Sequence, residues 1–293
     1  MEIFAYDFML RALIGALIVG VAAPAVGIFL VQKRMALIGD GLGHVALTGV
    51  ALGFLTNTSP LWTTLVVTAL GAVAVEWIRG KGKASGDVAL ALLFYGGIAG
   101  GVFITSLVSG KTNASLTEYM FGSLMTTRAG DIWIIGVLGV IVVAAMLLLR
   151  PWLAAICHDE EHARVSGLPV QTLNLLLAIT TAVTVAVAMR AVGLLLISAL
   201  LVVPVVTAQQ VTRGFAVTMY AAMGIGLATS GAGVVTAGLL NVPPGAAVVL
   251  MAVGLFVVVA FGRTSWLTVK RRLNRSTSTS PEEVTAERGH SAA

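Results

Sequence analysis

Charged residues are scarce in this sequence. Asp, Glu, Lys and Arg make up 11% of its 293 residues, whereas hydrophobic residues make up 58%. A typical soluble domain is about a quarter charged and about half apolar. A soluble globule with so few charges would not cover its own surface, which excludes an ordinary soluble enzyme. The net charge of +5 lies at the margins of the apolar runs and not on one basic face, which excludes a nucleic-acid binder.

Cysteine is almost absent, and the N-terminus lacks a basic region. Cys157 is the single cysteine, which excludes a disulfide framework and any zinc or iron–sulfur site built from several cysteines. The N-terminus carries Glu2 and Asp7 and runs directly into an apolar run that is too long for a signal peptide. We therefore expect no cleaved signal peptide.

What the sequence has in abundance is long apolar runs separated by turn and charge signals. A membrane-spanning helix needs about 20 apolar residues, and in lipid a helix satisfies its own backbone hydrogen bonds. The sequence therefore predicts an all-α fold, a polytopic transmembrane helical bundle with about nine spans (eight to ten). The predicted spans are 8–31, 36–55, 61–78, 88–109, 131–149, 173–191, 193–212, 215–236 and 244–261.

The distribution of Lys and Arg predicts the orientation, because segments inside a cell membrane are enriched in both. With the N-terminus outside, 14 of the 18 basic residues lie on the inner side and 4 on the outer side. The prediction is N-out, C-in. Segment 112–128 is too polar and short to span comfortably, and we interpret it as an outer or re-entrant segment. If it crossed, the count would be ten and the N-terminus would lie inside.

Two regions follow from this layout. Residues 1–262 form the transmembrane domain, in which 157–169 is part of the bulkiest inner loop. Residues 263–293 are basic and then rich in Ser, Thr and Glu, with almost no apolar residues to bury. We expect this tail to be disordered cytoplasmic chain.

Asp40 and His44 are the clearest candidates for chemistry, because ionisable residues inside a span are costly and mark functional sites. They are four residues apart and share one helix face, about 8–14 Å past the inner boundary. A carboxylate with an imidazole suits a divalent cation such as zinc, manganese or ferrous iron. Two ligands make a weak site, and a second copy of the helix across a homodimer would supply four. The spacing leaves open a buried proton relay or a packing lock.

Small residues and prolines mark further positions in the spans. Gly39 and Gly43 would let another backbone approach the Asp40–His44 helix closely. Pro204 predicts a kink in the seventh span, and Pro243 with Pro244 predicts a break at the start of the last.

The segment 157–169 is the other candidate for chemistry. His158 and His162 are four apart among acidic residues, so a metal site is conceivable. A short charged helix in a solvated loop is more typical of a docking surface, and Gly167 with Pro169 ends it sharply.

Four segments resemble a known family, and the resemblance covers residues 8–261. The run Lys33-Arg-Met-Ala-Leu-Ile-Gly-Asp-Gly-Leu-Gly-His at the start of 33–53 is similar to the signature of zinc, manganese and iron permease subunits of bacterial ATP-binding-cassette importers. Segments 118–123, 192–204 and 242–250 match in order.

The resemblance implies a homodimeric permease in the bacterial cell membrane, with two ATPase subunits inside and an extracytoplasmic metal-binding protein outside. It implies that Asp40 and His44 meet the metal in transit. No cofactor would be bound permanently; Zn²⁺, Mn²⁺ or Fe²⁺ would be the cargo, with zinc first. ATP hydrolysis would belong to the partner, so the chain would be no enzyme. The resemblance assigns the following residues to the coupling helix that docks in the ATPase: Asp159, Glu160, Glu161, Ala163 and Gly167.

Other classes of protein remain as alternatives. A proton-coupled secondary metal transporter would also use intramembrane Asp and His, without needing a docking segment. An importer permease for iron chelates or cofactors would need no such pair. The spans hold no His-Glu-x-x-His and no Ser/His/Asp set, which argues against an intramembrane enzyme.

Overall fold

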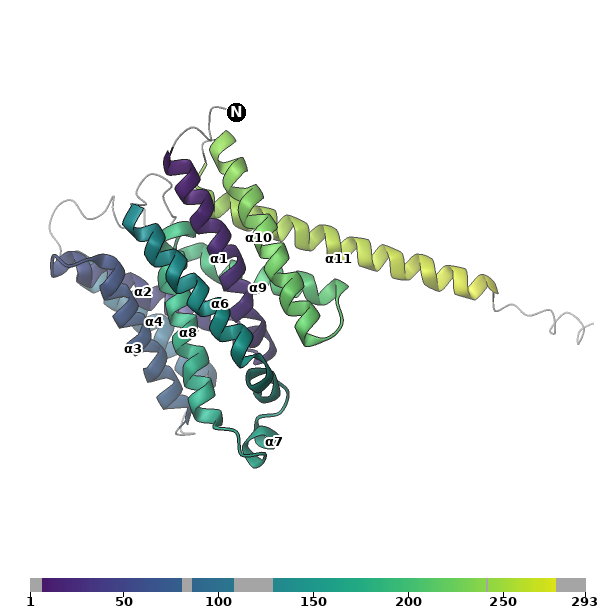
Figure 1. Ribbon diagram of the computed structural model, residues 1–293, viewed down its shortest axis with the longest axis horizontal. Helices are drawn as coiled ribbons and strands as arrows, with labels where there is room; N and C mark the ends of the chain where they lie inside the picture. The colour runs from purple at the N-terminus through teal and green to yellow at the C-terminus, as the bar shows by residue number, and fades with distance from the viewer. Residues whose placement is uncertain (1–6, 81–85, 108–128, 241, 278–293) are drawn as a thin grey trace, which may run out of the picture.

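The computed structural model describes residues 7–80, 86–107, 129–240 and 242–277, whose regular structure is helical throughout (Figure 1). Its helices are α1 (Asp7–Gln32), α2 (Ile38–Leu55), α3 (Pro60–Gly80), α4 (Gly86–Leu107), α6 (Ala129–His158), α7 (Glu160–Val165), α8 (Val170–Val192), α9 (Leu194–Val211), α10 (Phe215–Leu240) and α11 (Pro244–Thr277).

The long helices match the nine predicted spans in order. Eight of them are long and apolar enough to cross a membrane, and α9 adds the shorter apolar stretch Ile197–Val211. The predicted fold class is thereby confirmed. The orientation stays a prediction, and segment 112–128 lies outside the described residues.

Helix α6 is longer than its predicted span, which ended at residue 149. It continues to His158 with Pro151 inside it. A proline removes one helical hydrogen bond, and here burial of the next turns offsets that loss, since Leu153 and Ile156 are buried in the core. The C-terminal end of α6 is therefore separated from α7 by one residue.

Exposed tryptophans mark both ends of the apolar faces. Trp133 and Trp152 of α6 are exposed, and their separation of 19 positions corresponds to about 28 Å along the helix. Trp62 and Trp77 of α3 are exposed as well, with a separation of 15 positions, or about 22 Å. Tryptophan is enriched at the two interfaces of a bilayer, whose hydrocarbon core is about 30 Å thick. These pairs fit helices that cross a membrane from side to side.

Two helices form the centre of the bundle. The apolar windows of α1 and α8 are the most buried, each to 72%. Helix α1 packs against α6, α8, α9 and α10, whereas α2 packs against α3, α4, α8 and α9. Figure 1 shows α2, α3 and α4 on one side of α8, with α1, α9 and α10 on the other. Helix α8 therefore lies between the two groups, and α9 of the second group also contacts α2 of the first.

Glycines let several helices touch backbone to backbone. A Cβ atom on Gly97 of α4 would lie 2.7 Å from the backbone nitrogen of Val45 on α2. Likewise, a Cβ atom on Gly226 of α10 would collide with the carbonyl oxygen of Gly20 on α1. In lipid, small residues at helix contacts permit this close packing.

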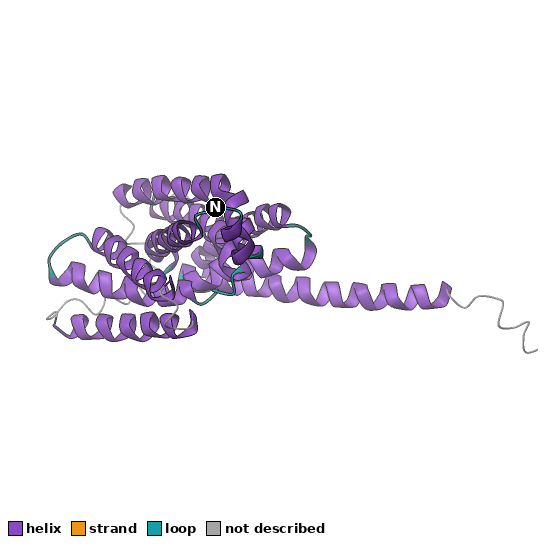
Figure 2. Cartoon of the chain, turned by 90° about the horizontal axis from the view of Figure 1, so that it is seen from below, coloured by secondary structure: helices purple, strands orange, loops and turns teal. Residues whose placement is uncertain are grey.

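Helix α11 projects far beyond the bundle (Figure 2). It continues to Thr277, past the boundary predicted at residue 262. The described part of the expected disordered tail, 263–277, is thus helical, because this stretch holds neither Gly nor Pro to end the helix. Residues 278–293 lie outside the described ranges.

Candidate functional site

Asp40 and His44 lie on α2, one turn apart and both half-buried. Asp40 is in the first turn of the helix, where the partial positive charge of the N-terminus stabilises a carboxylate. The prediction that both side chains share one face of a helix is confirmed.

Helix α9 covers the Asp40 end of this face. Ser198 Oγ donates a long hydrogen bond of 3.4 Å to Asp40 Oδ1. One residue earlier, a Cβ atom on Gly39 would lie 2.6 Å from the side chain of Leu201. At Gly43 the corresponding distance to Leu194 is 3.1 Å. Both glycines therefore serve packing within the chain.

Helix α4 covers the His44 end. The imidazole meets the Phe94 ring edge to face, with 4.5 Å between the ring centroids. One turn further along α2, Thr48 Oγ1 donates a 2.8 Å hydrogen bond to the carbonyl of Gly97. Asp40, His44 and Thr48 therefore form a polar stripe that α9 and α4 flank.

One chain supplies few metal ligands at this place. Among the described residues, no group of three or more His, Cys, Asp and Glu side chains lies close enough to hold a metal ion. Zinc sites in proteins use three or four protein ligands. Asp40 and His44 therefore supply two of the three or four ligands that such a site uses.

Segment 157–169 is organised around the six-residue helix α7. Asp159 caps its start, because its side chain accepts a 2.9 Å hydrogen bond from the backbone N–H of His162. Its end is a Schellman motif, in which Gly167 at φ 84° and Leu168 donate to the carbonyls of Arg164 and Ala163. Capping at both ends stabilises a helix too short to stand alone.

The two faces of α7 differ in exposure. Ala163 is 2% exposed and packs into the core, whereas Val165 is 88% exposed. Glu161 and His162 also lie on the exposed side. Helix α7 is therefore attached to the bundle by Ala163 and by the polar contacts of Glu160, and it presents Glu161, His162 and Val165 outward.

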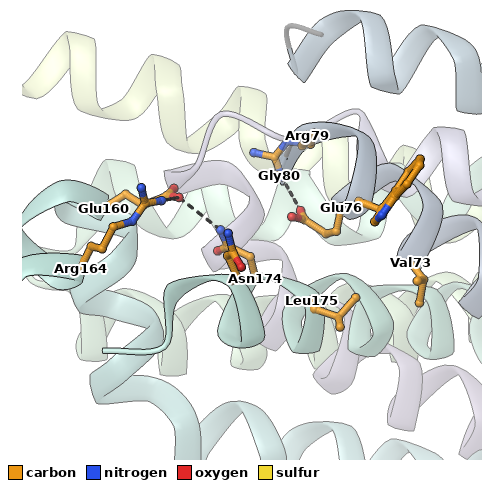
Figure 3. A pocket seen from close by; sticks show the side chains of 10 residues that line it. Val73, Glu76, Arg79, Gly80, Glu160, Arg164, Asn174 and Leu175 are labelled. Atoms are coloured by element: carbon orange, nitrogen blue, oxygen red, sulfur yellow. Dashed lines mark hydrogen bonds and ion pairs between the residues drawn. The ribbon is translucent and has the colours of Figure 1, made fainter. Parts of the chain in front are cut away.

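A cavity of about 590 Å³ opens between the end of α3, α7 and the start of α8 (Figure 3). Glu76 and Arg79 pair within α3 on one wall. Glu160 of α7 and Asn174 of α8 meet on the opposite wall, where Asn174 Nδ2 donates to Glu160 Oε1 over 3.4 Å. Its described lining residues include neither Asp40 nor His44, so this cavity is distinct from the candidate metal site.

The prolines have two different places. Pro204 lies inside α9, which also carries Ser198. Pro244 is the first residue of α11, and Pro243 precedes it. Proline fits the first helical turn, where its missing N–H costs nothing, so this pair separates α10 from α11.

Sequence reasoning missed several neighbours of the candidate residues. Ser198 and Phe94 carried no signal of their own, because Ser and Phe are ordinary residues of apolar spans. Lys33 entered the sequence analysis as a basic charge and as the first residue of the family-like run, and neither use predicted that its side chain is 7% exposed and paired with Glu160.

The long helices are apolar and expose apolar faces, and one of them carries a pair of ionisable residues. These features are typical of a polytopic membrane transport protein. Residues 5–263 match the ABC 3 transport family, and the chain belongs to this family. The resemblance noted from the sequence is thereby confirmed, as is a location in the bacterial cell membrane.

Similar proteins cover nearly the whole chain. A probable metal transport system membrane protein of Treponema pallidum is 32% identical over 87% of this chain and 95% of its own length. The high-affinity zinc uptake system membrane protein ZnuB of Haemophilus influenzae is 29% identical over 88% of this chain and 98% of its own. A solved chain of PsaBC from Streptococcus pneumoniae, in complex with Fab, superposes with a TM-score of 0.81 at 26% identity, covering 92% of this chain and 97% of that one.

Proposed function

We propose that this chain is the permease subunit of an importer for divalent transition-metal cations, and that its cargo is zinc. The observation that carries the proposal is the Asp40–His44 pair on one face of α2, flanked by α9 and α4. An ionisable pair within a span is costly, and transport paths are where membrane proteins keep such residues. The relatives named above include metal transport proteins, which supports the same class of cargo.

In the proposed mechanism, a binding protein delivers the cation to the outer mouth of a permease homodimer. Asp40 and His44 of both copies offer transient ligands near the middle of the membrane. Two ATPase subunits dock on the 157–169 segment, and their ATP cycle alternates the access of the site between outside and inside. The exposed surface of α7, with Val165 at its end, supports docking of a partner protein there.

The choice of zinc rests on ligand chemistry. Imidazole and carboxylate accept zinc, manganese and ferrous iron, and the intrinsic affinity order favours zinc over manganese. The names of relatives include zinc, manganese and chelated iron systems. Manganese and iron are therefore the alternatives to be measured beside zinc.

Two other functions compete with this one. A proton-coupled secondary transporter would keep its uptake after ATP depletion and lose it with the proton gradient. A permease for chelated iron or a cofactor would tolerate the loss of His44.

The test measures cellular zinc, manganese and iron by mass spectrometry in metal-starved cells that lack other importers. The strains are a deletion, the wild type, Asp40→Ala, His44→Ala and Ser230→Ala. Ser230 is the matched control, because it is a fully buried polar residue between α10 and α1, away from α2.

We expect one metal to fall in the deletion and to return with the wild type and Ser230→Ala but with neither α2 variant, at equal membrane levels. That metal names the cargo. An unchanged metal content in the deletion would overturn the metal-importer proposal, and full rescue by His44→Ala would return the pair to a structural role.

A further inference from the structure

Lys33 occupies an unusual position for a basic residue at the end of a span. It follows α1 directly and precedes α2 by five residues, yet its side chain is only 7% exposed. A lysine at a membrane boundary ordinarily extends toward water. A buried ammonium group requires partners, and here it has two of them from distant parts of the chain.

The partners of Lys33 come from α7 and α8. Its Nζ atom lies 3.6 Å from Glu160 Oε2 and donates a hydrogen bond to Asn174 Oδ1. Asn174 in turn donates to Glu160 Oε1. The three side chains close a ring of polar contacts, which we name the inner triad.

The inner triad joins three separate elements. Lys33 belongs to the turn between α1 and α2, Glu160 to the first turn of α7, and Asn174 to the second turn of α8. Asn174 is also buried, so Lys33 and Asn174 lie between the elements, while Glu160 is partly exposed at the cavity.

The turn that carries Lys33 is rigidly built. The backbone N–H of Met35 donates to the carbonyl of Leu30, and that of Ile38 donates to the carbonyl of Met35. Met35 itself is buried. A displacement of Lys33 is therefore passed to the start of α2, where Asp40 lies in the first turn.

We infer that the inner triad transmits the movement of α7 to α2, with Lys33 as its positioning residue. This inference rests on the proposed function, in which α7 docks on an ATPase and α2 carries the metal ligands. Glu160 has one other ionic partner, Arg164, which lies on the same short helix, is largely exposed and connects α7 to nothing else. Lys33 is thus the ionic link from α7 to the rest of the described chain.

The experiment uses the purified permease–ATPase complex in proteoliposomes, with the binding protein and zinc outside. Two quantities are measured together: zinc transported and ATP hydrolysed. Their ratio reports coupling, which a loss of folded protein would not change. The variants are Lys33→Met, Glu160→Gln and the exchanged pair Lys33→Glu with Glu160→Lys.

Glu76→Gln is the matched control. Glu76 forms an ion pair at the same end of the bundle and lines the same cavity, but its partner Arg79 lies on the same helix (Figure 3). Breaking that pair disconnects no two elements, so zinc transported per ATP should stay as in the wild type.

We expect zinc transported per ATP to fall about tenfold in Lys33→Met and in Glu160→Gln, the scale of effect seen when a contact in an ion-pair network is lost. The exchanged pair should recover most of the ratio, because the Asn174 amide can donate to a glutamate as well as accept from a lysine.

A wild-type complex without ATP-driven zinc uptake would refute the proposed function itself. A wild-type complex that transports, together with unchanged ratios in both single variants, would refute the inner triad alone. An equal fall of zinc transported per ATP in Glu76→Gln would also refute it, because the effect would then not be specific to the pair that joins α7 to the turn before α2. If Glu160→Gln does not fold, because it leaves the buried Lys33 ammonium without its carboxylate, Lys33→Met decides by the same ratio, since the Glu160 carboxylate that it leaves is 41% exposed.

Discussion

Residues that pack against α2 determine where its side chains lie, and Gly97 of α4 is the clearest example. Its missing side chain is what lets α4 touch the backbone of α2 beside His44, since a Cβ atom there would lie 2.8 Å from the carbonyl carbon of His44. The position of the imidazole therefore depends on a residue that makes no contact through a side chain of its own.

Gly97→Ala should displace α4 from α2 and destabilise the protein by about 1–3 kcal/mol, the usual cost of overpacking. Gly96→Ala is its control, because nothing lies within 4 Å of a Cβ atom there and alanine favours the helix. Thermal unfolding in detergent and cellular metal uptake measure both effects. Equal unfolding temperatures for the two variants would show that α4 can shift without cost.

Some residues of the candidate site could be predicted from the sequence and others could not. The pair Asp40 and His44 was predictable, because charge inside an apolar run stands out and a spacing of four defines a helix face. Ser198 was not, because it lies 158 residues from Asp40 and contacts it only through the packing of α9 on α2. The glycines were noticed as close-packing sites, but only the structure identifies α9 as the helix they meet.

At the scale of elements, each long helix was predictable from one apolar run, since in lipid a run of about 20 residues has no other stable form. The ends were less predictable. Arg150 and Pro151 resemble a boundary, and the continuation of α6 depends on core contacts of Leu153 that no local pattern reveals.

Helix α7 is the element most sensitive to a single substitution. Its six residues cannot form a stable helix alone, so the Asp159 cap contributes a large share of its order. Asp159→Ala should cost about 1 kcal/mol. Amide hydrogen exchange across 160–166 should then become about five times faster, while exchange in α8 stays unchanged.

Asp159→Ser supplies the control for this prediction, because a serine side chain also accepts a hydrogen bond at a helix start. Exchange in α7 should return close to the wild-type rate in that variant. Slow exchange in Asp159→Ala would mean that burial of Ala163 and the Schellman motif are sufficient to hold α7.

At the scale of the whole molecule, the candidate metal site and α7 belong to different parts of one bundle. Helices α2, α3 and α4 lie on one side of α8, and α7 joins α6 to α8. Movement of α7 would reach Asp40 and His44 through elements that bridge these parts. The turn between α1 and α2 is one such bridge, since it connects the central helix α1 to the helix that carries Asp40.

The number of metal ligands that one chain supplies determines how many zinc ions a pair of chains should bind. The described part of one chain brings no third His, Cys, Asp or Glu to Asp40 and His44, and in the proposed mechanism a second copy supplies the same pair. Helix α9 already covers the face of α2 that carries Gly39 and Gly43. The half-buried side chains of Asp40 and His44 are therefore what two copies would share at the site.

The purified wild-type permease should therefore bind one zinc ion per two chains. Mixed dimers, isolated with two different affinity tags, should bind zinc at least about tenfold more weakly when one copy carries His44→Ala, because one change removes a ligand from the shared site. Calorimetric titration gives both the stoichiometry and the affinity. One zinc ion per chain, with mixed dimers that keep half of the sites at wild-type affinity, would instead mean that each chain binds its cargo alone.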